Sequence, residues 1–504
     1  MRKLLRYAIF CLVFSGIQLI FADEVSLTRP PKIFPDYIGV TIPPNIAPMN
    51  FLIQEDGTKF RTRFSSPMSS GFLVENKGPD IRIPISKWRK LLEESRGTNI
   101  FIEIEAFSGQ WLKFERITNF VAPEKIDSWI AYRYLKPLYN FYINMSIRQR
   151  CLETFEEKPI LQNTSFNHGC LNCHTFLNYK TDKFAFHTRT SRKGNPMILC
   201  LSNEPVRVDR TAGYISWHPS GRLIAYSANK LSLFYHTVGE TRDVFDAESN
   251  LGIYRVDSNT VVVPPALAQP EILETWPNWA PDGKYLYYCA APKLPIKRYR
   301  EVKYDLMRIP YDIETDKWGE PEKLVSAEAF NLSTHEPRVS PDSRFVLFCM
   351  SEYGNFPVYR PDSDIYIMDL QNRSIRRLEL NSEKSDSWHC WSSNGRWILF
   401  SSKRIDGLFA RPHISYFDST LKSHKAFVLP QLDPSFYQTC FYTFNVPEFI
   451  SEPVRIDENT LAKAIDGRLR VLKPRVVQEG PPREEQIHME ESAPETMYYQ
   501  TQKQ

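Results

Sequence analysis

The sequence predicts an all-β protein that contains a β-propeller. Three observations support this fold class. Segments of similar sequence recur four times between residues 217 and 401, and short runs before residue 150 alternate apolar with polar residues. The segments between the repeats lack the 3.6-residue period of amphipathic helices. Short strands that recur at regular intervals, separated by turns, are typical of propellers, in which each repeat supplies one small sheet.

The repeat is carried by a turn between two apolar strands. Each copy ends one strand on Trp or Val, reverses through a Pro/Ser-Asp/Asn-Gly turn and enters an apolar run. The copies are residues 217–227, 279–289, 339–349 and 391–401. Ser343 and Asn394 stand where Gly and Asp are usual, so we expect altered turns there. Residues 196–450 have room for five or six blades at about 40–45 residues each.

The residues before and after these repeats predict two further regions. Residues 23–150 contain alternating runs such as Lys59-Phe-Arg-Thr-Arg-Phe64 and a hairpin at Ser108-Gly109, which predict a β-sandwich-like domain. One short helix is expected at 86–95, with Ser86 as its candidate N-cap. Residues 451–504 are polar and end in a Gln-rich stretch, so we expect a tail that is partly disordered from about residue 480.

The pentapeptide Cys170-Leu-Asn-Cys173-His174 reads C-x-x-C-H, the attachment signature of a c-type haem. The two thiols can add to the vinyl groups of one porphyrin, and His174 then binds the iron as its proximal ligand. A half zinc site and a thioredoxin-like pair are the alternatives, but the sequence has no second C-x-x-C and no βαβ context. We expect one covalent haem c on an attachment segment, residues 151–195, in the seam between the sandwich and the propeller.

The sixth iron ligand decides what such a haem does. His187 and Met197 are the nearest downstream candidates. A Met ligand raises the reduction potential, a second His also suits electron transfer, and an open position allows gas sensing or peroxide chemistry. The alternatives are a hydrogen-bonded interfacial histidine for His187 and a core strand residue for Met197. Arg189 and Arg192 are candidate partners for the haem propionates, with solvent-exposed arginine as the alternative.

The amino terminus indicates export. Residues 1–22 have a basic start (Arg2, Lys3 and Arg6), an apolar run from Tyr7 to Phe21, and a small residue at Ala22, as secretory signal peptides do. Ile20 is larger than the residue preferred at its position, so an N-terminal anchor remains an alternative. No other segment is long and apolar enough to span a membrane. We therefore expect a periplasmic or otherwise extracytoplasmic protein.

Charge and cysteine content limit the partners. The chain carries +4, and three of these charges lie in the first 22 residues, so the exported part is nearly neutral. A nucleic-acid binder that works through a general basic field is thereby excluded. The other six cysteines of the exported part permit disulfides without establishing any, and apolar flanks favour buried free thiols at Cys289 and Cys349. The six are Cys151, Cys200, Cys289, Cys349, Cys390 and Cys440.

The repeat turns resemble the W-S-P-D-G turns of TolB-type, WD-like propellers over about residues 196 to 450. With the signal-like start and the C-x-x-C-H motif, the chain resembles bacterial periplasmic TolB-like propeller proteins that carry a cytochrome c motif. Three further segments support the resemblance: Ile42-Pro-Pro-Asn-Ile-Ala-Pro48, Phe186-His-Thr-Arg189 and Ser385-Asp-Ser-Trp-His-Cys-Trp391. The resemblance implies haem attachment and a propeller, and it implies no particular reaction.

Three functions are consistent with these features. The first is a monohaem c-type cytochrome that exchanges electrons with a redox partner docked on the propeller. The second is a propeller that binds an envelope protein or a glycan, with a structural or sensory haem. The third is a haem enzyme that uses the propeller channel. The sequence shows no motif for a second cofactor and no Gly-x-Ser-x-Gly elbow, so we expect an electron carrier or a binding module rather than an enzyme.

Overall fold

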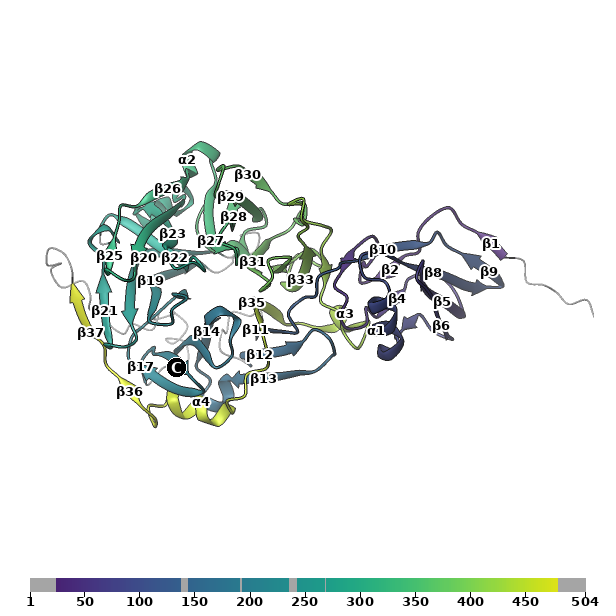
Figure 1. The fold of residues 1–504 in the computed structure, drawn as a ribbon, viewed down its shortest axis with the longest axis horizontal. Coiled ribbons are helices and arrows are strands. Elements are labelled where there is room, and N and C mark those ends of the chain that lie inside the picture. The colour runs from purple at the N-terminus through teal and green to yellow at the C-terminus, as the bar shows by residue number, and fades with distance from the viewer. Residues whose placement is uncertain (1–23, 137–143, 191–192, 235–242, 268, 479–504) are drawn as a thin grey trace, which may run out of the picture.

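Six small antiparallel sheets follow one another around a common centre in the computed structural model, which describes residues 24–136, 144–190, 193–234, 243–267 and 269–478 (Figure 1). We call them ring sheets 1 to 6. The amino-terminal part of the chain adds two more sheets beside the ring. No helix among the described residues has both the length and the apolar character needed to cross a membrane. The predicted signal peptide, residues 1–22, lies outside the described residues.

Ring sheets 1 to 3 use strands from both ends of the chain. Their first-named strand lies nearest the centre in each case. Sheet 1 is β35 (Thr443–Ile450), β11 (Trp129–Leu135), β12 (Ser146–Cys151) and β13 (Glu157–Gln162). Sheet 2 is β14 (Cys170–Phe176), β15 (Lys183–Arg189), β16 (Met197–Leu201), β17 (Glu204–Val208) and β36 (Val471–Leu472). Sheet 3 is β18 (Ile215–Trp217), β19 (Leu223–Phe234), β20 (Asp243–Arg255), β21 (Thr260–Val263) and β37 (Arg475–Gln478).

Ring sheets 4 to 6 are built from consecutive strands. Sheet 4 is β22 (Ile272–Trp279), β23 (Tyr285–Pro292) and β24 (Asp305–Asp312), with β25 (Lys317–Trp318) and β26 (Glu322–Val325) both pairing with β24. Sheet 5 is β27 (Ser333–Val339), β28 (Phe345–Ser351), β29 (Asp364–Asp369) and β30 (Ile375–Arg377). Sheet 6 is β31 (Asp386–Trp391), β32 (Trp397–Ser402), β33 (Arg411–Tyr416) and β34 (Phe427–Val428). Short helices α2 (Ala327–Phe330) and α3 (Phe436–Thr439) lie in the loops.

The ring is closed by a strand from the far end of the chain. The innermost strands contact one another in the order β14, β18, β22, β27, β31 and β35, and β35 contacts β14 again. β35 completes sheet 1 by pairing antiparallel with β11, more than 300 residues earlier in the chain. Radial repetition of this kind leaves only short, protected strand edges at the centre. The chain therefore has the all-β, propeller-like fold that the repeats predicted.

The repeat turns are tight because their central residue adopts a left-handed backbone. Gly221, Gly283 and Gly395 have φ of 74°, 72° and 67° at the turn between the first two strands of their sheets. Ser343 occupies the same place in sheet 5 with φ 56°, so that turn is kept despite the missing glycine. Asn394 also keeps its turn, since its Oδ1 accepts a hydrogen bond from the backbone N–H of Arg396.

The ring includes residues that were expected outside it. β13, β14 and β15 lie within residues 151–195, which were expected to be an attachment segment, and the ring begins at Trp129 rather than at residue 196. The part of the expected tail up to residue 478 contains helix α4 (Glu458–Ile465), β36 and β37. β36 and β37 pair parallel with β17 and β21 at the outer edges of sheets 2 and 3. The rest of that tail, 479–504, is not among the described residues.

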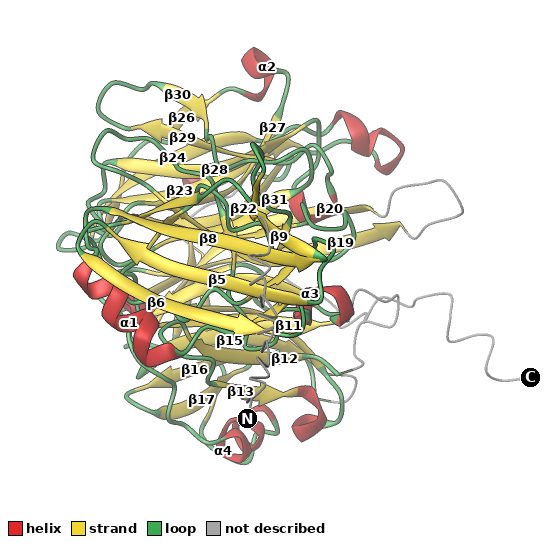
Figure 2. Cartoon of the chain, turned by 90° about the vertical axis from the view of Figure 1, so that its right-hand side faces the viewer, coloured by secondary structure: helices red, strands yellow, loops and turns green. Residues whose placement is uncertain are grey.

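The amino-terminal part forms two sheets and one helix. The seven-stranded sheet is β1 (Glu24–Ser26), β3 (Thr41–Ile42), β5 (Lys59–Ser66), β6 (Ser69–Asn76), β8 (Asn99–Ser108), β9 (Gln110–Lys113) and β10 (Ile117–Val121). The three-stranded sheet is β2 (Ile33–Phe34), β4 (Phe51–Ile53) and β7 (Asp80–Ile81). Helix α1 (Ile85–Glu94) lies beside β6 (Figure 2). It matches the expected helix, but Pro84 rather than Ser86 is its N-cap residue.

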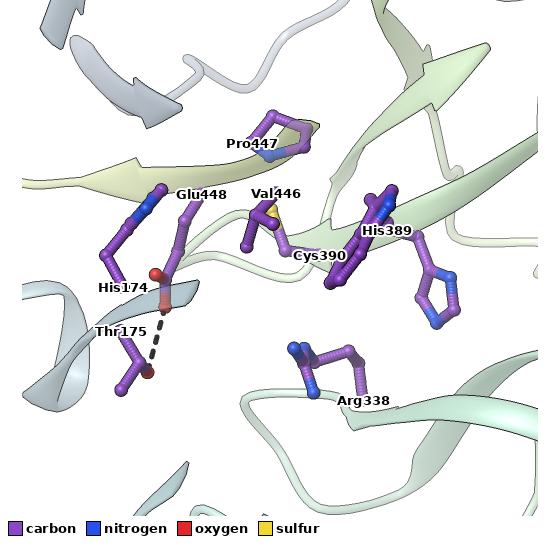
Figure 3. A pocket seen from close by; sticks show the side chains of 9 residues that line it. His174, Thr175, Arg338, His389, Cys390, Val446, Pro447 and Glu448 are labelled. Atoms are coloured by element: carbon purple, nitrogen blue, oxygen red, sulfur yellow. Dashed lines mark hydrogen bonds between the residues drawn. The ribbon is translucent and has the colours of Figure 1, made fainter. Parts of the chain in front are cut away.

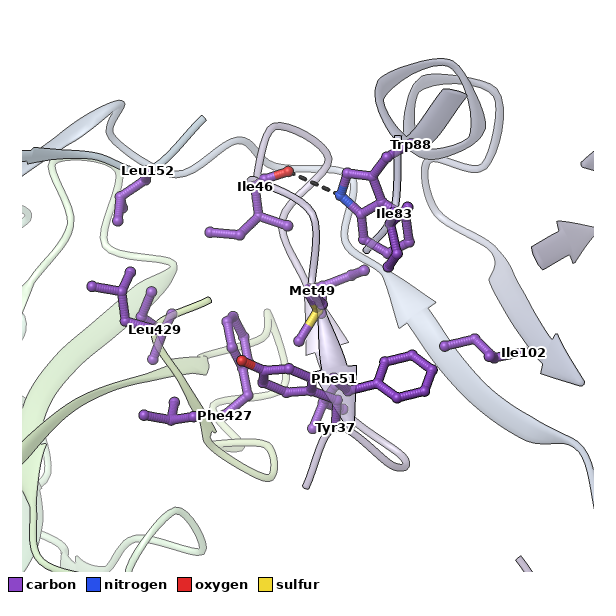
Figure 4. Close-up of a cluster of buried hydrophobic side chains, with 14 of the residues drawn as sticks. Tyr37, Ile46, Met49, Phe51, Ile83, Trp88, Ile102, Leu152, Phe427 and Leu429 are labelled. Carbon is purple, nitrogen blue, oxygen red and sulfur yellow. Dashed lines mark hydrogen bonds between the residues drawn. The ribbon is translucent and has the colours of Figure 1, made fainter. Parts of the chain in front are cut away.

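One apolar core joins this part to the ring. Trp88 of α1 is buried and donates a hydrogen bond from Nε1 to the Ile46 carbonyl (Figure 4). The same cluster continues through Met49 to Phe427 and Leu429, which belong to or follow β34 of sheet 6. A contact of this depth fixes the amino-terminal sheets against one side of the ring.

Candidate functional site

The C-x-x-C-H motif lies on β14, the innermost strand of ring sheet 2. It is therefore inside the ring and not in a seam between two domains. Cys170 is in register with Arg189 of β15, and His174 with Phe186. Between these pairs the register shifts, so that Asn172 and Cys173 stand opposite a single residue. This is a β-bulge, which bends a strand and redirects the side chains at that point.

The bulge sends the two thiols into different surroundings. Cys170 belongs to an apolar cluster between sheets 1 and 2, and Cys173 belongs to a cluster at the centre of the ring. Both side chains are buried, and burial raises the pKa of each thiol. Both are therefore protonated at neutral pH in the folded chain, and neither has the exposed, electropositive setting of a reactive cysteine.

His174 is buried, and no hydrogen bond of good geometry reaches its ring among the described residues. Its side chain is 3% exposed, and the Ala131 backbone beside the ring has a small raising effect on its pKa. Burial, with a smaller effect from Arg133, lowers the pKa of His174 to about 3. The imidazole is therefore neutral and keeps a free lone pair, which is the state in which histidine binds a metal. A buried polar group without a well-formed hydrogen bond costs free energy, so this position points to a missing partner.

His187 and Met197 lie on the other face of the same sheet. Because His174 is in register with Phe186, the next residue of β15, His187, points to the opposite face. Met197 is in register with His187 and packs in a cluster with Trp217 of sheet 3. The described structure therefore does not bring the two expected sixth ligands to His174. His187 is buried, no hydrogen bond of good geometry reaches either of its ring nitrogens among the described residues, and burial lowers its pKa.

A buried arginine lies among these groups. Arg133 of β11 lowers the pKa of Cys170, Cys173, His174 and His187, so its guanidinium is close to all four. Its side chain is 8% exposed, and its Nε has no hydrogen-bond partner among the described residues. It was not singled out from the sequence, because nothing in the alternation of β11 marks it.

The expected propionate partners are only partly described. Arg189 is partly buried at the end of β15 and lowers the pKa of His187. It is in register with Cys170, which keeps it next to the motif. Arg192 lies outside the described residues. Arg189, the unexpected Arg133 and Arg338, which lines a pocket with His174, are therefore cations that the structure places near the motif.

A second feature of the centre is shared by four other sheets. Trp276, Glu336, Trp388 and Val446 each have φ between 51° and 55° at a bulge in the innermost strand. Left-handed backbone is uncommon for such residues and costs about 1–3 kcal/mol at each position. Trp276, Glu336 and Trp388 each lie three positions before the residue that begins their repeat copy, which is Trp279, Val339 or Trp391.

These bulges fill the centre of the ring with large side chains. Tyr214 stacks on Trp276 with ring centroids 3.4 Å apart, and Trp276 meets Trp388 edge-on at 5.2 Å. Cys173 and Val446 complete the same cluster. Trp276 and Trp388 are buried, so the axis at this level is closed by aromatic rings.

A small pocket remains beside this aromatic cluster. His174 and Glu448 lie side by side on one wall, with Arg338 and His389 on the other (Figure 3). Its cavity volume is about 20 Å³, enough for about one water molecule. Glu448 accepts hydrogen bonds at 3.4 Å from the Phe176 N–H and the Thr175 hydroxyl. Burial raises the pKa of Glu448 to about 7, against a smaller lowering effect of Arg338.

The side chains of this site suit a c-type haem, but the cavity beside His174 is too small for one. Two thiols, a buried neutral imidazole and buried arginines are the groups that thioether attachment, iron ligation and propionate binding need. A pocket for a group of this size has a volume of at least about 300 Å³, far more than the cavity beside His174. The zinc alternative is not supported for the motif. Among the described residues, one group of three metal-ligand atoms converges, and it contains no residue of the C-x-x-C-H motif.

No disulfide forms among the described cysteines, since all eight are free and buried. One histidine of the repeat, His218, has two polar contacts. Its Nε2 contacts the Gly283 carbonyl at 3.1 Å, and its Nδ1 contacts the Ser220 hydroxyl at 2.8 Å. These contacts fix the turn of ring sheet 3 against that of ring sheet 4.

Comparison with known proteins adds little beyond fold. No family model matches the chain, and no curated protein matches it. A chain of a nidogen/laminin complex has a TM-score of 0.39 and 10% identity over 64% of this chain and 100% of its own length. Hydrazine synthase of Kuenenia stuttgartiensis has a TM-score of 0.43 and 11% identity over 66% of this chain. A puromycin-hydrolyzing peptidase of Mycobacterium tuberculosis has a TM-score of 0.36 and 10% identity over 67% of this chain.

The matches to the two enzymes cover 48% of the hydrazine synthase chain and 51% of the peptidase chain. At such low similarity, none of these likenesses bears on chemistry. The propeller-like fold rests on the strand pairing of this chain itself.

Proposed function

We propose that this chain is an extracytoplasmic monohaem c-type cytochrome with a TolB-like propeller as docking platform. In this proposal, Cys170 and Cys173 hold one covalent haem, His174 is its proximal ligand, and the six ring sheets are the six blades. The two amino-terminal sheets form a sandwich-like domain, and residues 1–22 direct export. The reaction is electron exchange with a redox partner that docks on the ring.

The observation that carries the proposal is the buried, neutral imidazole of His174 directly after the C-x-x-C pair. Among the described residues no hydrogen bond of good geometry reaches either ring nitrogen, and the Ala131 backbone is the one group that acts on the ring as a hydrogen-bond partner. The neutral form of His174 offers a ligand atom at the place where the motif delivers the proximal ligand. Arg133 supplies a buried positive charge nearby, which would balance a propionate.

Burial of the thiols constrains when attachment happens. Cys170 and Cys173 are both buried once β14 is paired with β15. Thiols in this position do not react, so any bond to them has to form before β14 joins ring sheet 2. We therefore expect that haem added to the folded apoprotein does not become covalently bound.

A second function is favoured by the small pocket and by the separation of the thiols. A cavity of about 20 Å³ and thiols in two apolar clusters suit a propeller that binds an envelope protein or a glycan and carries an unreacted C-x-x-C pair. A haem enzyme is the least supported of the three functions, because the pocket beside His174 has no room for a substrate.

Absorption spectra of the exported protein, produced with a haem-attachment system, separate these functions. We expect a pyridine haemochrome spectrum typical of two thioether bonds, together with fast reversible reduction. The C170A/C173A variant should lose the band. The matched control is C200A, which removes a buried free thiol of β16 in the same sheet and should keep it. A wild-type protein that folds, is exported and binds no haem would refute the cytochrome function and leave the binding platform.

A further inference from the structure

A cluster of three metal-binding side chains lies between ring sheets 5 and 6, apart from the C-x-x-C-H motif. Glu336 comes from β27, Cys349 from β28 and His389 from β31. One ligand atom of each lies within 4.8 Å of the others, and no other group of three such residues converges in this way in the described part of the chain. All three side chains are buried, with at most 2% exposed.

The backbone of the ring brings these side chains together. Glu336 is the left-handed residue of the bulge in β27, with φ 53°, and His389 follows the equivalent residue of β31, Trp388. Cys349 is in register with His335, the residue before Glu336. The backbone N–H of Trp388 donates a hydrogen bond of 2.6 Å to Glu336 Oε2, which fixes the carboxylate. Two adjacent sheets therefore hold the three side chains in place.

The distances suit tetrahedral coordination. Cys349 Sγ lies 3.7 Å from Glu336 Oε2 and 3.5 Å from His389 Nδ1. Around zinc, a sulfur at about 2.3 Å and a nitrogen or oxygen at about 2.0–2.2 Å would be about 3.6 Å apart at the tetrahedral angle. Both distances are thus within about 0.1 Å of the edges of a zinc tetrahedron.

Hydrogen bonding alone does not satisfy this cluster. The single thiol hydrogen of Cys349 faces three acceptors, which are Glu336 Oε2, His389 Nδ1 and the Asp386 carbonyl at 3.7 Å. It can serve only one of them. Glu336 Oε1 has no hydrogen-bond partner among the described residues, and no hydrogen bond of good geometry reaches His389 Nε2, although the backbones of Leu347 and Glu336 lie beside the ring. Buried polar atoms in such numbers normally indicate a group that accepts their lone pairs.

Charge favours a divalent cation. Once the metal displaces the thiol proton of Cys349, a carboxylate and a thiolate carry two negative charges, which one divalent ion would neutralise. Thiolate, imidazole and carboxylate in a tetrahedral arrangement are the ligands that zinc prefers.

We propose that Glu336, Cys349 and His389 bind one divalent ion of the zinc class inside the ring. Three protein ligands leave a fourth coordination position for water or for a backbone oxygen. His389 also lines the small pocket beside His174. The proposal does not depend on whether the motif on β14 carries haem.

Cobalt is the probe that tests the site. The full-length protein is purified, stripped with a chelator and titrated with Co²⁺, while elemental analysis of the untreated protein counts zinc separately from iron. We expect one equivalent of zinc, and a thiolate-to-cobalt charge-transfer band with the intense visible bands of tetrahedral cobalt. H389Q should weaken cobalt binding by at least about tenfold.

Two cysteine variants decide which thiol binds. C349S should lose the charge-transfer band, whereas C170A/C173A should keep it, because those thiols lie outside the cluster. If C349S does not fold, E336Q keeps the shape of the side chain and should show the same loss of zinc affinity. A folded wild-type protein that binds neither zinc nor cobalt overturns the proposal. So does a band that survives C349S and disappears in C170A/C173A.

Discussion

Glu448 makes the stability of the ring depend on pH. Its carboxylate faces the pocket beside His174, and its Oε2 is buried without a hydrogen-bond partner among the described residues. Burial raises the pKa of this group from 4.5 to about 7. Between these two values the folded chain keeps a proton that the unfolded chain has released. The free energy of unfolding therefore falls as the pH rises through this interval, and it levels off above it.

The change in the free energy of unfolding that Glu448 causes follows from the difference between its pKa values in the unfolded and folded chain. At about 1.4 kcal/mol per pH unit, ionisation of Glu448 costs the folded state about 3 kcal/mol at most by pH 8. E448Q removes the ionisable group and keeps the shape of the side chain. We expect the free energy of unfolding of E448Q, relative to wild type, to increase by up to about 3 kcal/mol between pH 4.5 and pH 8.

The assay is urea unfolding followed by tryptophan fluorescence at constant ionic strength, over that pH range. The control is E452Q, which removes the same charge from an exposed residue two positions beyond β35. Its difference from wild type should not change with pH. If the difference in the free energy of unfolding between E448Q and wild type stays constant from pH 4.5 to 8, the pKa of Glu448 is not raised by the fold, whatever the size of that difference.

Three further predictions concern packing, turns and thiols. L461A removes a buried side chain of α4 and should lower the free energy of unfolding by about 2–5 kcal/mol in urea titrations, with no loss expected if α4 merely rests on the surface. G395A should cost about 1–2 kcal/mol through its left-handed φ alone, since its added Cβ meets only a Pro341 carbon at 3.6 Å. S343G should cost less than G395A, because it relieves the left-handed φ of Ser343 and loses only the exposed hydrogen bond that the Ser343 hydroxyl accepts from the Asp282 N–H. The eight described cysteines should not react with a thiol reagent until the chain unfolds, and labelling at the native rate of an exposed thiol would contradict their burial.

The sequence predicted the sheets that carry the repeat turn more completely than the others. Gly221, Gly283 and Gly395 mark sheets 3, 4 and 6, because a tight turn there needs a left-handed residue. Sheets 1 and 2 lack the Trp-x-Pro-x-Gly turn, so their strands did not stand out. Closure of the ring by β35 depends on a pairing across more than 300 residues, and no local pattern encodes such a pairing.

The sequence also predicted only part of the candidate site. The C-x-x-C-H motif can be read directly from the sequence. Arg189, a candidate propionate partner from the sequence, lies on the strand next to the motif. Which face each side chain takes depends on the register of β14 with β15, and a bulge shifts that register. That is why His187 was expected beside His174 and lies on the opposite face. The Glu336 cluster joins three strands of two sheets, and sequence spacing alone gave no signal for it.

The most direct test of the proposed function is the intact mass of the exported, denatured protein. Denaturation removes any haem that is held only by the fold, so a retained mass reports covalent bonds. We expect denatured wild type and denatured C200A to carry the added mass of one haem, and denatured C170A/C173A to lack it. A denatured wild-type chain with the mass of its amino acids alone, from cells that attach haem to another c-type cytochrome, would contradict it.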